Sequence, residues 1–147
     1  MNAEFIVAVH ALIYLYHKNG NVQSEELARN VCTNPARIRK IMSKLKKKGL
    51  IEAHGSGSGG YRFIKDPESI TLLDIFEATA GSIIKVTWRS GKNCECPISR
   101  KMAPVMDGVF SRVENAARSS LGEINLREIN RSIFDGEKTP EDFKCGC

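Results

Sequence analysis

The sequence lacks an apolar segment long enough to cross a bilayer. Its longest apolar stretch, near the N-terminus, is interrupted well short of the roughly 20 residues that a membrane helix requires. It also lacks a secretory signal, since the only charge early in that stretch is the acidic Glu4 and no small-residue cleavage site follows. We therefore expect a cytoplasmic protein that has no membrane partner.

Histidine is scarce, and no Cys-x-x-Cys pair occurs. The three histidines, His10, His17 and His54, show no spacing that would set a catalytic base beside a nucleophile. We therefore expect no enzymatic activity. The five cysteines are odd in number and the cytosol is reducing, which argues against a structural disulfide framework. Metal binding, redox chemistry and plain burial remain open for these cysteines.

Positive charge is concentrated in the first half of the chain. Residues 1–65 contain 11 lysines and arginines against 4 acidic residues, a net charge of +7. Residues 66–147 contain 11 basic and 13 acidic residues, a net charge of −2. A basic half joined to a near-neutral half indicates a polyanionic partner such as DNA, although a solvated basic face would give the same composition.

Helical periodicity fills most of the first 66 residues. Ser24 and Asn34 are placed to cap the second and third helices, and Pro35 suits a first turn. Two strand-like runs flank the glycine-rich segment GSGSGG, which predicts a hairpin. The expected elements are helices at residues 3–17, 24–31 and 35–48 and strands at 50–54 and 61–65. This order predicts a winged helix-turn-helix, mainly α with a small β-hairpin wing.

The third helix takes the place of the recognition helix of that motif. Short and basic side chains at its N-terminal end can reach base edges, and the lysines that follow can meet phosphates. We expect these residues at the major groove or its edges: Thr33, Ala36, Arg37, Arg39, Lys40 and Ser43. Ser24 and Asn34 are further expected DNA-binding residues. We expect these residues at the DNA backbone or minor groove: Lys44, Lys47, Tyr61 and Arg62.

The second half predicts a helix at 71–80, a polar loop at 89–96, a long periodic helix from Pro97 and a short helix at 126–134. The long helix has a wide apolar stripe that needs a partner surface. The same helix of a second chain would make a homodimer, and packing on its own domain is the alternative. We expect a DNA-binding domain at residues 1–66, an effector loop with dimerisation helices at 67–134 and a flexible polar tail at 135–147.

Several segments together resemble a known family. They are FIVAVHALIYL, SEELA, NPARIRKIMSKLKKKGLIEA, GGYRFIKDPESITLLDIFEATAG and the Cys-Pro-Ile before the long helix, which span about residues 1–130. This sequence resembles the bacterial winged-helix regulators of the IscR, NsrR and CymR type. The resemblance implies a homodimeric transcription regulator, which we expect to be a repressor that binds a pseudo-palindromic operator in double-stranded DNA.

The sequence departs from the family pattern at two places. His54-Gly55-Ser56 stands where relatives often have Arg-Gly-Pro, so the wing arginine that many of them use is missing at that place. Cluster-binding relatives have three cysteines in the loop before the long helix, whereas this chain has Cys94 and Cys96. Only Cys96 matches their pattern, so we expect no iron–sulfur cluster of the family type.

Cys32 precedes the recognition helix, where a helix N-terminus and Arg37 would favour its thiolate. Relatives that sense hypochlorite have one cysteine in this turn and another in the effector loop. The resemblance therefore implies control by thiol oxidation, in which Cys32 forms a disulfide with Cys96 or Cys94, expected to be between subunits. The alternative for Cys32 is the role of a small buried hydrophobe.

Two other effectors remain open for the same fold. Zinc or an iron–sulfur cluster could be held near the effector loop, and four thiolates suit tetrahedral zinc. The candidate metal ligands are Cys94, Cys96, Cys145 and Cys147. A small molecule could instead bind near Phe76, Trp88 and Met102, or a partner enzyme could dock on the C-terminal region.

Overall fold

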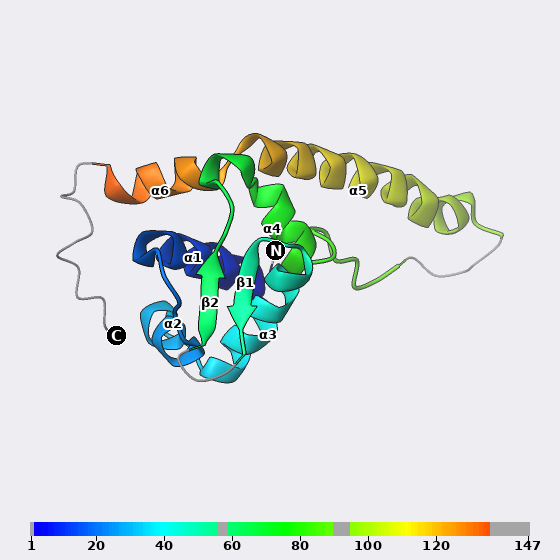
Figure 1. Cartoon of the computed structure of the whole chain (residues 1–147). Coiled ribbons are helices and arrows are strands. Elements are labelled where there is room, and N and C mark those ends of the chain that lie inside the picture. The colour runs from blue at the N-terminus through cyan, green and yellow to red at the C-terminus, as the bar shows by residue number, and fades with distance from the viewer. Residues whose placement is uncertain (1, 56–58, 90–94, 136–147) are drawn as a thin grey trace.

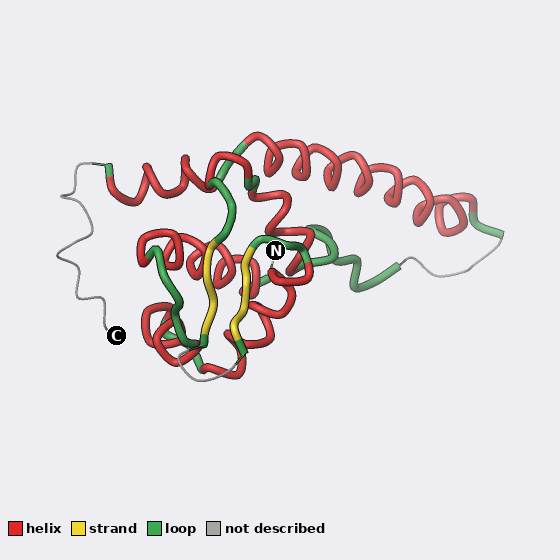
Figure 2. The backbone as a smooth tube through the Cα atoms, viewed as in Figure 1, coloured by secondary structure: helices red, strands yellow, loops and turns green. Residues whose placement is uncertain are grey.

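The computed structural model describes residues 2–55, 59–89 and 95–135 (Figure 1). The elements in chain order are α1 (Ala3–Lys18), α2 (Ser24–Val31), α3 (Pro35–Lys47), β1 (Ile51–His54), β2 (Gly60–Phe63), η1 (Pro67–Ser69), α4 (Leu72–Thr79), α5 (Pro97–Glu123) and α6 (Leu126–Phe134). Helices dominate, and β1 and β2 form an antiparallel hairpin (Figure 2). The predicted fold class, a mainly helical winged helix-turn-helix followed by a long helix, is confirmed.

The core forms around α1, which packs against α2, α3, α4 and β2. Leu12 and Leu15 are completely buried, as the near-continuous apolar sequence of this helix requires. Ile41 and Met42 of α3 and Phe76 of α4 are also completely buried against this centre. The recognition helix is therefore held by its apolar side, which leaves its basic side outward.

Local capping fixes where the helices begin. The Asn34 side chain accepts a hydrogen bond from the Arg37 backbone N–H at 2.8 Å, and Pro35 occupies the first turn, as predicted. The expectation that Ser24 caps α2 is wrong, because Gln23 is the N-cap and Ser24 is the first helical residue. The Ser24 hydroxyl instead donates to a Glu25 carboxylate oxygen at 3.1 Å.

The wing is joined to the segment before α2. Val22 and Tyr61 exchange two backbone hydrogen bonds of 2.9 and 2.8 Å. The hairpin therefore continues onto the chain that leads into α2. Gly60 makes this possible, since its φ is +157° and a Cβ there would lie 2.6 Å from the Val22 carbonyl oxygen.

The long helix α5 begins at Pro97 and continues through Pro104. Its C-terminal end is packed, with Leu121 buried, and the turn into α6 pairs with the start of α4 through a hydrogen bond of 2.9 Å from the Leu72 N–H to the Ile124 carbonyl. Its first half projects beyond the remaining described fold (Figure 1). Residues 83–89 lie between α4 and α5 without forming a strand.

No helix among the described residues is both long and apolar enough to span a membrane. The predicted tail at 135–147 lies outside the described residues except for Asp135. The division of the chain at residues 66 and 134 stays a prediction.

Replacing Gly60 by alanine should destabilise the protein. The new methyl group would clash with the Val22 backbone, so the wing or the segment before α2 must shift, at a cost of about 1–3 kcal/mol. Urea unfolding of Gly60→Ala measures this cost. Gly55→Ala is the matched control, because a Cβ at Gly55 meets nothing within 4 Å. Equal stability of the two variants would contradict the proposed close approach.

Candidate nucleic-acid interface

The outer side of α3 is a continuous exposed face. Exposed positions recur at intervals of three and four residues, which places them on one side of the helix. These residues are Ala36, Arg39, Lys40, Ser43, Lys46 and Lys47. Small side chains lie toward the N-terminal end and lysines toward the C-terminal end, so a groove of DNA would meet short side chains flanked by positive charge.

Arg39 links this face to α2 and the wing. Its Nη1 lies 3.4 Å from the Ser24 hydroxyl and 3.6 Å from a Glu25 carboxylate oxygen. Burial raises the pKa of Tyr61, and the nearby Arg39 cation opposes that rise. Two predicted interface residues, Ser24 and Arg39, are thus brought together from two elements, and Tyr61 of the wing lies near enough for the Arg39 charge to act on it.

Glu25 adds a negative charge to the same surface. A hydrogen bond from its own backbone N–H, the Ser24 hydroxyl and the positive field of Arg39 lower the pKa of its carboxyl group. The carboxylate is therefore ionised at neutral pH. Both partners of the Arg39–Glu25 pair are largely exposed, and such surface pairs contribute little stability, so Arg39 can exchange Glu25 for another acceptor.

Two lysines of α3 reach toward α1: Lys40, from the edge of the exposed face, and the half-buried Lys44. Their ammonium groups are 2.9 and 2.5 Å from the two carboxylate oxygens of Glu4. Hydrogen bonds from Lys44 and then Lys40 lower the pKa of Glu4. Lys44 also lies 3.4 Å from the Thr79 carbonyl oxygen at the end of α4. These two lysines therefore hold the recognition helix to its own domain.

Lys46 is an exposed residue that the sequence analysis did not place among the DNA contacts. It lies beside Lys47, and neither forms an ion pair with another described residue. Lys48, the last of these three consecutive lysines, pairs with Glu77 of α4 instead. Lys46 and Lys47 are thus the lysines of this face with ammonium groups available to phosphates.

The two wing residues proposed for DNA contact lie on opposite faces of the hairpin. Tyr61 is half-buried, whereas Arg62 is exposed and opposes Glu52 across the strands. Arg62 lines an open cleft of about 770 Å³ with Lys65, His17 and Asn130, between α1, the wing and α6. The structure therefore does not bring Arg62 together with Ser24, Arg39 and Tyr61.

The turn between α2 and α3 holds Cys32 in a left-handed backbone conformation with φ of 60°. Cys32 is exposed, so the alternative of a buried small hydrophobe is wrong. Cys32 is disulfide-bonded and Cys96, the N-cap of α5, is a free thiol, so these two described residues are not joined within one chain. A bond between subunits stays a prediction, and Cys94 lies outside the described residues.

The proposed effector region holds a small apolar pocket. It has a volume of about 170 Å³ and lies between residues 86–89 and the first half of α5, lined by Val86, Trp88, Met102, Met106 and Phe110. An Arg89–Asp107 ion pair of 2.8 Å lies at its edge. The expectation that Phe76 joins Trp88 and Met102 is wrong, because Phe76 is completely buried and packs edge-on against Phe5 at 5.9 Å.

Metal ligands do not gather in the part of the chain that the structure describes. No group of three or more histidine, cysteine, aspartate or glutamate side chains lies close enough there to hold an ion. Of the four cysteines considered for zinc or an iron–sulfur cluster, only Cys96 is described, while Cys94, Cys145 and Cys147 are not. The zinc or iron–sulfur alternative therefore stays a prediction, because three of its four proposed ligands lie outside the described residues.

Comparisons with known proteins agree with this geometry. YwnA of Bacillus subtilis strain 168, a proposed HTH-type transcriptional regulator, is 28% identical over 134 residues, which cover 91% of this chain and 99% of YwnA. The crystal structure of a proposed transcriptional regulator from Lactobacillus plantarum has a TM-score of 0.81 at 26% identity and covers 90% of this chain and 91% of that one.

The structure of CymR, the global cysteine regulator of B. subtilis, has a TM-score of 0.66 at 19% identity, over 90% of this chain and 96% of that one, and shows the shared fold. The model of the Rrf2 family, described as an iron-dependent transcriptional regulator, matches residues 1–132. The resemblance to IscR- and CymR-type regulators is thus confirmed, and the chain belongs to the Rrf2 family of transcriptional regulators.

Proposed function

We propose that this protein is a homodimeric repressor that binds a pseudo-palindromic DNA operator and is released by oxidation of Cys32. The observation that carries the DNA-binding part is the exposed face of α3, where Arg39 reaches the Ser24 hydroxyl of α2. Arg39 is placed to read a base edge. Its exposed ion pair with Glu25 contributes little stability, so the guanidinium can leave Glu25 and bind a guanine instead. Lys46 and Lys47 supply phosphate contacts.

Pairing through α5 explains why an apolar stripe remains uncovered. Five apolar side chains of α5 are exposed at steps of four, three, four and four residues, which places them on one side of the helix. They are Ile98, Met102, Val105, Val109 and Val113. The same stripe of a second copy is self-complementary about a two-fold axis, and that symmetry matches a pseudo-palindromic operator.

Thiol control is supported by the place of Cys32. This exposed residue ends α2 and lies two residues before Asn34, the cap of the recognition helix. The structure holds Cys32 in a disulfide, which is its oxidised form. In the reduced protein, hypochlorous acid can oxidise the Cys32 thiol and the thiol of Cys96 or Cys94 from the partner to a disulfide, with loss of two protons and two electrons, while the hypochlorous acid becomes chloride and water. A tether at this turn would shift the first turn of α3 out of register with DNA.

Arg39→Ala should weaken binding to an operator that the protein itself selects from a random pool of duplexes. Loss of a base contact predicts about 10- to 100-fold weaker binding and relaxed preference at one base pair. Lys47→Ala should weaken binding to DNA of every sequence by a similar factor. It should also reduce the number of counterions released on binding, given by the salt dependence of the affinity, by about one. Fluorescence anisotropy over a salt series measures both effects. The control is Lys85→Ala, which changes an exposed lysine outside α3. Unchanged affinity of both α3 variants would refute the interface.

Val105→Glu combined with Val109→Glu should convert the dimer to a monomer. Two carboxylates in the centre of the stripe would be desolvated without a partner, which a dimer interface does not tolerate. Sedimentation velocity at micromolar concentration measures the change. Asn115→Glu is the control, because Asn115 is exposed on α5 away from the stripe. A wild-type monomer, or a dimer that survives both glutamates, would exclude this interface.

Cys32→Ser should abolish release from DNA by mild hypochlorite without changing the affinity of the reduced protein. Anisotropy reports release, and a peptide map under non-reducing conditions identifies the bond. Cys96→Ser tests the partner thiol and should abolish the intersubunit bond unless Cys94 supplies it. Continued release of Cys32→Ser by the oxidant would overturn thiol control and leave the DNA-binding proposal in place.

A further inference from the structure

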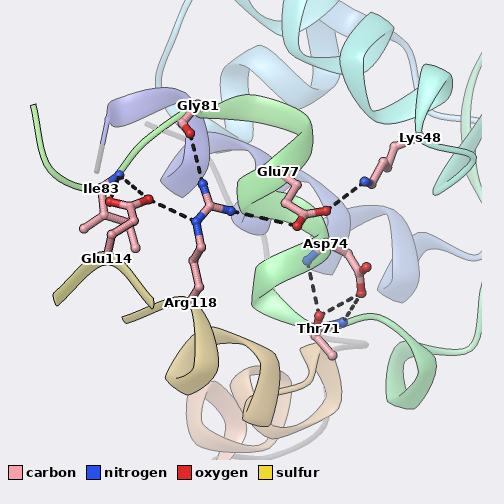
Figure 3. Close-up of polar contacts among 8 residues, drawn as sticks. All are labelled: Lys48, Thr71, Asp74, Glu77, Gly81, Ile83, Glu114 and Arg118. Carbon is pink, nitrogen blue, oxygen red and sulfur yellow. Dashed lines mark hydrogen bonds and ion pairs between the residues drawn. The ribbon is translucent and has the colours of Figure 1, made fainter. Parts of the chain in front are cut away.

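The C-terminal end of α4 lies between the recognition helix and α5 (Figure 3). The beginning of α4 is fixed by a capping box, in which the Thr71 hydroxyl accepts from the Asp74 N–H at 3.2 Å and the Asp74 carboxylate accepts from the Thr71 N–H at 2.9 Å. Its last turn contains no basic residue of its own. The negative end of this helix therefore depends on cations from other elements.

Cations from α3 and its C-cap reach α4 from one side. Lys48, which caps α3, pairs with Glu77 at 2.9 Å, and Lys44 lies 3.4 Å from the Thr79 carbonyl oxygen. Each contact by itself is weak, because the Lys48–Glu77 pair is partly exposed and the Lys44 distance is long. Together they orient the second half of the recognition helix on α4.

Arg118 of α5 reaches the same end of α4 from the other side. Its Nη2 donates to the Gly81 carbonyl at 3.0 Å, and its Nη1 lies 3.9 Å from a Glu77 carboxylate oxygen. The guanidinium also lies 5.3 Å from the ring centroid of Phe76, which is completely buried in the core. Glu77 is therefore shared by Lys48 and Arg118.

Glu114 extends this arrangement to the chain that leaves α4. Its carboxylate accepts from Arg118 Nε at 3.0 Å and from the backbone N–H groups of Ile83 and Ile84, each at 3.0 Å. The hydrogen bonds from Ile84 and Ile83 lower the pKa of Glu114, so the carboxylate is ionised at neutral pH. The start of the α4–α5 connection is thereby held against the long helix.

We propose that Arg118 is a positioning residue for operator recognition, which sets the orientation of the recognition helix relative to α5 by holding the C-terminal end of α4. The proposal rests on the proposed function, because it requires that α3 reads DNA and that α5 joins two subunits. In such a dimer the two recognition helices must sit about 34 Å apart, or a multiple of this, to enter successive major grooves. Arg118 then affects how two half-sites are bound together and leaves each half-site contact intact.

The test compares binding to a complete operator with binding to one half-site. Both duplexes come from selection with the wild-type protein from a random pool, and a third set varies the number of base pairs between the half-sites. Arg118→Met should weaken binding to the complete operator about tenfold relative to the half-site and should broaden the tolerated spacing. Arg118→Lys keeps a charge and should restore part of the selectivity.

Two further variants separate positioning from folding. Glu114→Gln removes the negative charge beside Arg118 at constant size and should shift the spacing preference in the same direction. Arg127→Met breaks an exposed ion pair of α6 with Glu68, and should change neither the affinity ratio nor the spacing. Urea unfolding of each variant establishes that the protein compared is folded.

The positioning role would be overturned if Arg118→Met lost the same factor of affinity for the complete operator and for the half-site. It would also be overturned if the ratio of these two affinities and the tolerated half-site spacing both stayed as in the wild type. Failure of the proposed function gives a different result. In that case Arg39→Ala binds every duplex as wild type does, or wild type itself shows no advantage for a complete operator over a half-site.

Discussion

The burial of α1 is the constraint on which the rest of the molecule depends. A helix that is apolar on most sides has to be covered on most sides, and here α2, α3, α4 and the wing provide the cover. Polar side chains of α1 then reach three of the surrounding helices, α2, α3 and α6. The contacts are Glu4 with Lys40 and Lys44 of α3, His10 with Asn30 and Tyr14 with Glu26 of α2, and His17 with Asn130 of α6. Hydrophobic burial brings these elements together, and the polar contacts fix their direction.

This arrangement divides the positive charge of the recognition helix between two tasks. Lys44 and Lys48 are directed to α1 and α4, while Arg39, Lys46 and Lys47 remain on the outer face. The surface left for a polyanion is therefore narrower than the net charge of the first 65 residues indicates. Glu25 reduces it further, because its carboxylate lies beside Arg39. Such a face favours recognition of a few base pairs over strong binding to DNA of any sequence.

The sequence was sufficient for most of the fold because helices and hairpin turns are local. Periodicity, Asn34 and Pro35 located the recognition helix, and the glycine-rich segment located the wing. The cap of α2 was misassigned, because capping depends on the backbone conformation of Gln23 and not only on a favourable side chain at Ser24.

The site was less accessible to sequence reasoning than the fold. The pairing of Lys40 with Glu4 joins residues 36 positions apart, and no pattern in the chain reports it. Phe76 and Trp88 show the same limit of sequence reasoning. Both were predicted to line a pocket, but the Phe76 side chain is completely buried and Trp88 is 76% exposed. Which side of a helix is covered by a distant element is decided only by packing.

The separation of tasks along α3 has a consequence for how such a regulator can change its target. Positions 36, 39 and 43 lie on the outer face, and Lys44 and Lys48 reach α4, which in turn contacts Arg118 of the long helix. Substitutions at the outer positions can alter the bases that are read while the contacts to α4 stay intact. Under the proposed roles, the outer side chains of α3 read the operator sequence, whereas the contacts of Lys44, Lys48 and Arg118 with α4 determine half-site spacing, so either property can vary without loss of the other.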